Sequence, residues 1–192
     1  MNKLVCASLA LVAVLVAGSP GVSQVTDGKE SFTAVAVAST NLRSGAGTVL
    51  IDIARWSTEA ERTRLVSTLQ NDGPEALLRL LQDTPPTGTI RTPDSLAYDL
   101  RFAHQAPGEE GGRRIVLATD RPIGFWEAST RPRTIDYPFT VIQMEIGRDG
   151  QGKGTMSYAT KIVAQDNLIV LENFETAPVM LTQIQARKPG SR

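Results

Sequence analysis

The sequence predicts an α+β, mostly β fold: an antiparallel β-sandwich or partly closed barrel of about nine strands, with an inserted helical hairpin at residues 57–84. Short segments in which apolar and polar residues alternate recur along the chain and are separated by turn residues, which is typical of antiparallel strands. A helical period occurs in one stretch only. Helices therefore do not alternate with strands as they would in a doubly wound sheet.

Residues 1–23 are expected to be a signal peptide. Lys3 precedes an apolar run from Leu4 to Ala17, and the small residues 18–21 follow it. The run is shorter than the roughly 20 apolar residues of a membrane span, and an uncleaved N-terminal anchor is the alternative. We expect cleavage after Ser23, or after Gly18, and an exported chain, periplasmic or secreted, with no stable membrane span after cleavage. Residues 24–192 then form a single β-rich domain.

Composition and charge exclude several classes of protein. The chain has 20 basic and 20 acidic side chains, one histidine and one cysteine. A net charge of zero argues against a nucleic-acid partner. One histidine and one cysteine cannot form a Cys/His zinc site. Cleavage after Ser23 removes Cys6, so the mature chain is cysteine-free and without a disulfide, and burial alone must hold the domain together.

The first two strands and the hairpin are predicted from clear local signals. Residues 29–40 and 48–56 alternate as strands. Thr58 and Glu61 have the spacing of a capping box, which places the start of a helix there. Asp72-Gly73 ends that helix, and Pro74 suits the first position of a second one. Neither helix is long enough to be stable alone, so the pair needs a sheet to cover.

The remaining chain follows a period of two. Along residues 96–104, we expect Leu96, Tyr98, Leu100, Phe102 and His104 to share one apolar face. The other expected strands are residues 88–92, 114–118, 123–128, 139–146, 155–165, 168–172 and 179–186.

The run Gly147 to Gly154 matches the Walker A spacing as far as Lys153, but Gly154 stands where Ser or Thr should bind magnesium. Residues 155–160 alternate as a strand, whereas a phosphate-binding loop leads into a helix. We interpret the run as a hairpin turn whose glycines tolerate positive φ. No cofactor is expected.

No catalytic residue is assigned. His104 is the only imidazole and the chain has no Gly-x-Ser-x-Gly motif, so we expect a half-buried histidine that closes a core. Four carboxylates are candidates for glycoside hydrolysis by residue type alone, namely Glu127, Asp136, Glu145 and Glu172. The loop acids lack the spacing of a calcium loop, so no metal ligand is expected; they are Glu109, Glu110, Asp149 and Asp166.

The positive functional hypothesis concerns residues 119–138, where arginines and aromatic residues gather in one irregular stretch. This composition is typical of contact sites, and arginine suits carboxylate and phosphate groups. The candidate ligand-binding residues are Arg121, Trp126, Glu127, Arg131 and Arg133. Their expected partner is an anionic small molecule or an acidic protein surface. The alternative is structural: Phe125 and Trp126 plug the core, and Glu127 and Asp136 pair with the arginines.

The runs Arg114–Glu127 and Ile135–Phe139 resemble those of an uncharacterised family of small exported bacterial β-rich proteins. The resemblance implies a shared fold across most of the mature chain and brings no activity, cofactor or site.

Three functions follow as hypotheses. The first is an exported, non-enzymatic domain that binds a ligand or a protein at the cell envelope. The second is a hydrolase that uses carboxylates or a Ser–His104 pair, and a pocket containing such a pair would favour it. The third is a structural envelope protein without a ligand, which a closed and filled core would favour.

Overall fold

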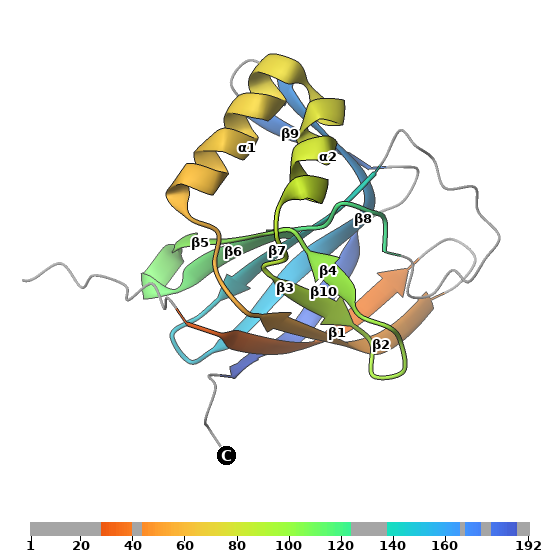
Figure 1. The fold of residues 1–192 in the computed structure, drawn as a ribbon. Coiled ribbons are helices and arrows are strands. Elements are labelled where there is room, and N and C mark those ends of the chain that lie inside the picture. Colours follow the sequence, from red (N-terminus) through yellow and green to blue (C-terminus); the bar gives the residue numbers. More distant parts are fainter. Residues whose placement is uncertain (1–27, 40–43, 124–137, 166–167, 174–177, 188–192) are drawn as a thin grey trace, which may run out of the picture.

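Ten antiparallel strands form a nearly closed, barrel-like sheet, and two helices lie on its outside (Figure 1). The computed structural model describes residues 28–39, 44–123, 138–165, 168–173 and 178–187. The predicted signal peptide lies outside these residues. The fold class predicted from the sequence is confirmed, with the strands arranged as a barrel.

The helices and strands follow one another as a β pair, a helical hairpin and then strands to the end. Their bounds are β1 (Glu30–Ser39), β2 (Ser44–Ile53), α1 (Glu59–Asp72), α2 (Pro74–Asp83), β3 (Gly88–Arg91), β4 (Tyr98–Leu100), β5 (Phe102–Pro107), β6 (Arg113–Ala118), β7 (Phe139–Ile146), β8 (Gln151–Gln165), β9 (Leu168–Asn173) and β10 (Val179–Arg187). A single 3-10 turn, Glu109–Gly111, connects β5 to β6.

The strands pair in the order β4-β3-β2-β1-β10-β8-β7-β6-β5, and β9 pairs with β8 beyond this path. The two end strands of the path, β4 and β5, are separated by Arg101 alone. The Arg101 amide donates to Ala118 of β6, and Leu100 accepts from the Thr87 amide before β3. The chain itself therefore joins the two edges of the sheet.

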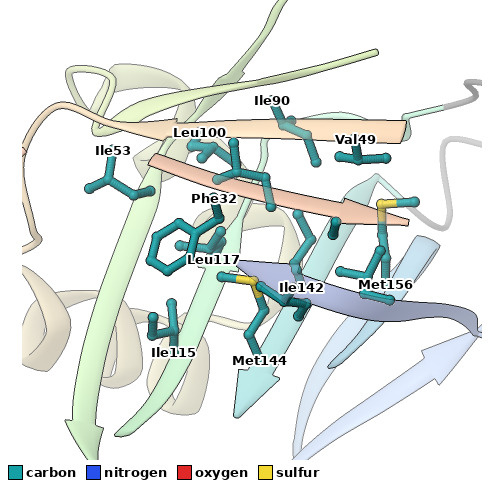
Figure 2. Packing of buried hydrophobic residues seen from close by; sticks show 14 of the residues in the cluster. Phe32, Val49, Ile53, Ile90, Leu100, Ile115, Leu117, Ile142, Met144 and Met156 are labelled. Carbon is teal, nitrogen blue, oxygen red and sulfur yellow. The ribbon is translucent and has the colours of Figure 1, made fainter. Parts of the chain in front are cut away.

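The barrel interior is filled by side chains from every strand that lines it (Figure 2). Along β1, Phe32, Ala34 and Ala36 are buried and alternate with partly exposed residues, which is the period-two pattern of the sequence. Figure 2 shows Phe32 among Leu117, Ile142 and other side chains of facing strands. Interior positions of small barrels are commonly filled in this way.

A buried ion pair closes one end of this interior. Arg113 on β6 donates to both carboxylate oxygens of Glu30 on β1, one of these bonds (Nη1 to Oε2) measuring 2.8 Å. It also donates to Gln105 Oε1 at 2.9 Å, and its guanidinium lies over the Phe32 ring at 5.8 Å from the centroid. Since β10, β8 and β7 separate β1 from β6 in the sheet, the pair links distant parts of the barrel wall.

The hairpin prediction is confirmed in its details. Thr58 is the N-cap of α1: its side chain accepts from the Glu61 amide at 3.1 Å, and Glu61 Oε2 accepts from the Thr58 amide at 2.8 Å. Gly73, at φ 82°, separates the helices, and Pro74 is the first residue of α2. The left-handed φ explains why a glycine stands at this corner.

The expected strand over residues 96–104 is wrong in one respect: its apolar residues do not share a face. Leu100 is buried inside the barrel, whereas Phe102 packs in a second cluster outside it, and Leu96 is 90% exposed. The strand leaves β3 and joins β6 at Arg101. This residue lies 3.4 Å from Asp99, lies 3.5 Å from Asp120 and donates to the Thr84 carbonyl. Interruption of the pleat there reverses which residues face inward.

The glycine run is a hairpin, as predicted, but the turn is shorter than expected. The Gly150 amide donates to Gly147, and Gly150 has φ 79°. β8 begins at Gln151, so Gly152 and Gly154 are strand residues. A Cβ at Gly152 would stand 2.2 Å from the Glu145 carbonyl oxygen, and one at Gly154 2.3 Å from that of Gln143. Close strand approach, and not positive φ, accounts for these two glycines.

Candidate functional site

The helical hairpin covers the outer face of the barrel beside β5 to β9 (Figure 1). Its buried leucines pack against apolar side chains that point out of the strands, and these form a second cluster separate from the barrel interior. The members of this cluster are Leu65, Leu69, Leu77, Leu81, Phe139, Val141 and Ile162, with Leu78, Leu80, Phe102, Val116 and Leu171 partly buried against them. This outer face provides the apolar sheet surface that the two helices were predicted to need.

A pocket of about 280 Å³ lies between the hairpin and the strands. Its roof is formed by α1 and α2, and its floor by outward residues of β5, β6, β7, β8 and β9. The lining side chains are Arg62, Leu65, Val66, Leu69, Leu77, Leu81, Phe102, Val116, Ala118, Val141, Gln143, Ile162 and Leu171. Only Arg62 and Gln143 among them are polar. For scale, an apolar cavity of about 150 Å³ binds benzene.

The strand register orders the floor into rows. His104, Val116 and Gln143 lie side by side across β5, β6 and β7. The row two residues further along contains Phe102, Ala118 and Val141. Of these two rows, the first therefore contains polar as well as apolar side chains, and the second contains only apolar ones.

Three ionisable side chains meet beside the polar row. Glu59 Oε1 lies 3.6 Å from His104 Nδ1, and Glu59 Oε2 lies 3.5 Å from Arg62 Nη1. His104 also stacks on Phe102, with ring centroids 6.1 Å apart. Burial lowers the pKa of His104; the negative charge of Glu59 opposes this effect and the positive charge of Arg62 adds to it. A neutral His104 is therefore favoured at neutral pH.

The base of the hairpin is tied to the barrel. Arg55 Nη1 donates to Glu61 Oε2 at 3.0 Å and its Nη2 donates to the Pro85 carbonyl at 3.0 Å, so one side chain joins the start of α1 to the end of α2. The bond from Arg55 lowers the pKa of Glu61. The Ser57 amide donates to the Ala103 carbonyl at 2.7 Å. These bonds fix the base of the hairpin in place.

Of the five predicted ligand-binding residues, the structure describes only Arg121. Its side chain is 56% exposed, its Nε lies 3.3 Å from Asp120 Oδ1, and it does not line the pocket. Asp120 is buried and also lies beside Arg101. Trp126, Glu127, Arg131 and Arg133 lie outside the described residues. The anion site over residues 119–138 stays a prediction.

The structure also places the candidates for other chemistry. His104 is half-buried as predicted, but it faces out of the barrel toward α1 and does not close the interior. Glu145 is exposed and lies 3.9 Å from Lys153; Glu127 and Asp136 lie outside the described residues, as does the side chain of Glu172. Within the described ranges, no three His, Cys, Asp or Glu side chains gather as metal ligands would. No described helix is both long and apolar enough to cross a membrane.

Sequence reasoning missed the pocket, although a signal for it was present. Residues 114–118 carry Ile115, Val116, Leu117 and Ala118 in one run. Such a run indicates a strand buried on both faces. The strand therefore needs apolar neighbours on its outer face as well as in the barrel interior. The helical hairpin, which needs an apolar sheet to pack against, can provide them.

Comparison with family models, with curated proteins and with solved structures finds no match, so the pocket is interpreted from this chain's own geometry.

Proposed function

We propose that this chain is an exported, non-enzymatic binding protein that holds a small apolar molecule beneath its helical hairpin. The observation that carries the proposal is the apolar pocket of about 280 Å³ on the outer face of a barrel whose interior is filled. Concave and mostly apolar sites with a few polar groups are the usual form of small-molecule pockets.

The contrast with the interior supports a ligand site. Apolar side chains that border a hollow lose dispersion contacts on that side, and a bound apolar molecule would restore them. The bonds of Arg55 and Ser57 fix the base of the hairpin against the barrel. A preformed site of this kind binds at a low cost in ordering.

Binding can be measured by titrating the protein with a naphthylamine dye whose fluorescence rises in apolar surroundings. Ala118→Leu places a larger side chain in the pocket floor and should weaken binding at least about tenfold. Ala60→Leu is the matched control, because Ala60 is an exposed residue of α1 that does not line the pocket. Equal binding by the wild type and both variants would contradict the proposal.

Export is the second part of the proposal, and the apolar segment of residues 4–17 supports it. Intact mass measured on protein from the envelope fraction should correspond to a chain that begins near Gln24 or Ser19. Full-length protein recovered from the cytoplasm alone would contradict export and leave the pocket to be judged by the dye titration.

A further inference from the structure

The outer face of the barrel changes character along the strands. The row formed by Ala106, Arg114, Glu145 and Lys153 contains three charged side chains and one alanine. Across the same four strands, the next row holds His104, Val116, Gln143 and Thr155, and the one after it holds Phe102, Ala118, Val141 and Ser157. Charged side chains thus give way to uncharged ones from the first row to the third, which lies in the pocket floor.

The roof follows the same gradient. Arg62 lies in the first turn of α1, and Leu65 and Leu69 follow it at intervals of about one turn. α2 returns antiparallel with Leu77 and Leu81 buried. Arg62 in the roof and Gln143 in the floor are the polar side chains among the described lining residues, and the others are apolar.

Among the described residues that line the pocket, Arg62 is the only charged one. Its side chain is 47% exposed, and its partner Glu59 is 72% exposed at a separation of 3.5 Å. Exposed pairs of this kind contribute little, so an incoming anion can replace Glu59 as the partner of Arg62. A guanidinium suits a carboxylate, which it can hold through two parallel hydrogen bonds.

The volume restricts the apolar part of the ligand. The pocket has less than twice the roughly 150 Å³ of a cavity that binds benzene. One alkyl chain of medium length fits such a space, whereas the two chains of a membrane phospholipid do not.

We infer that the pocket takes a single-chain amphiphile with a carboxylate head group, received by Arg62 and Gln143, and with its tail between the hairpin and the strands. This inference rests on the proposed function, because it names the ligand class of the same pocket.

The experiment compares decanoate with decanol, both below their aggregation limits, by displacement of the naphthylamine dye. The two probes share a tail and differ in head-group charge. Arg62→Gln should weaken decanoate binding about tenfold, since a hydrogen bond to a charged group is lost, and should leave decanol binding unchanged. Arg64→Gln is the matched control, because Arg64 is an exposed arginine of the same helix that does not line the pocket.

Two further measurements give the inference independent support. Glu59→Gln removes the competing carboxylate and should tighten decanoate binding, and leave decanol binding unchanged. In the wild type, added NaCl should weaken the binding of decanoate but not of decanol, because salt screens the exposed head-group contact.

The outcomes separate the inference from the proposed function. If decanol and decanoate displace the dye equally well and Arg62→Gln alters neither, the carboxylate inference is overturned and the apolar pocket stands. If the dye binds nowhere near Ala118 and neither probe binds, the proposed function fails together with the inference.

Discussion

The two faces of the same strands are packed in different ways. On β6, Ile115 and Leu117 are fully buried among side chains that fill the barrel, whereas Val116 and Ala118 face outward and line a pocket. A barrel of this size leaves room inside for its own side chains and little else. The comparison teaches that the pocket is made by adding a second wall, the helical hairpin, to the outside of a filled barrel.

The largest expected difference between the two faces comes from matched phenylalanines. Phe32→Ala should lower the free energy of unfolding by about 3–5 kcal/mol, because it opens a cavity in a closely packed interior. Phe102→Ala, at the pocket wall, should cost less, about 1–2 kcal/mol, since Phe102 is only partly buried there. Urea unfolding of both variants measures this. Equal losses would mean that the outer cluster is packed as tightly as the interior.

Matched alanines test the same comparison in the opposite direction. Ala103→Leu adds volume to the filled interior from β5 and should destabilise the fold by about 1–3 kcal/mol. Ala118→Leu adds the same volume on the neighbouring strand, where the pocket can receive it. Its unfolding free energy should stay within about 0.5 kcal/mol of the wild type. Thermal melts compare the two variants. If Ala118→Leu were less stable than Ala103→Leu, the result would contradict the presence of free volume beside Ala118.

The outer face should also carry a dependence of stability on pH. Because the folded-state pKa of His104 lies below its ordinary value, its contribution to stability is fully present above about pH 6.5 and decreases as the pH falls through the lower folded pKa. His104→Asn removes the only imidazole of the chain. Its urea midpoint should therefore change less than that of the wild type between pH 7.5 and pH 5, and parallel curves would contradict this assignment.

The smallest effect is expected at an exposed residue near the start of β8, next to the turn that joins it to β7. Lys153 is exposed, and its Nζ lies 3.9 Å from Glu145. Lys153→Ala should change the unfolding free energy by less than about 0.5 kcal/mol. ATP should not raise the melting temperature of either form, because the run is a hairpin turn. A melting temperature that rises with ATP only when Lys153 is present would overturn that interpretation.

Elements with strong local signals were predicted closely. The capping box at Thr58 and Glu61, the corner at Gly73 and the alternation along β1 all depend on contacts within a few residues. The same is true of the β7–β8 hairpin, although its turn ends earlier than expected. Local hydrogen bonding and side-chain period decide such features, and both can be evaluated from the sequence.

The interpretation of residues 96–104 went wrong where a contact distant in sequence decides the structure. The reversal of faces at Arg101 depends on the strand changing partner from β3 to β6. The buried pair between Glu30 and Arg113 likewise joins residues 83 positions apart. Neither feature can be predicted from the period or spacing of the sequence, because each depends on strands that come together only when the sheet closes.

By itself, the sequence determined that this chain forms antiparallel strands with one helical hairpin, since burial period and end-capping are local properties of the chain. Only the tertiary structure decided where the hairpin lies, and therefore that Arg62 of the hairpin and Gln143 of the sheet both line an apolar pocket. The physical reason is that a pocket is the space left between two surfaces. Its size and polarity depend on how those surfaces approach each other, and neither surface contains that distance in its own sequence.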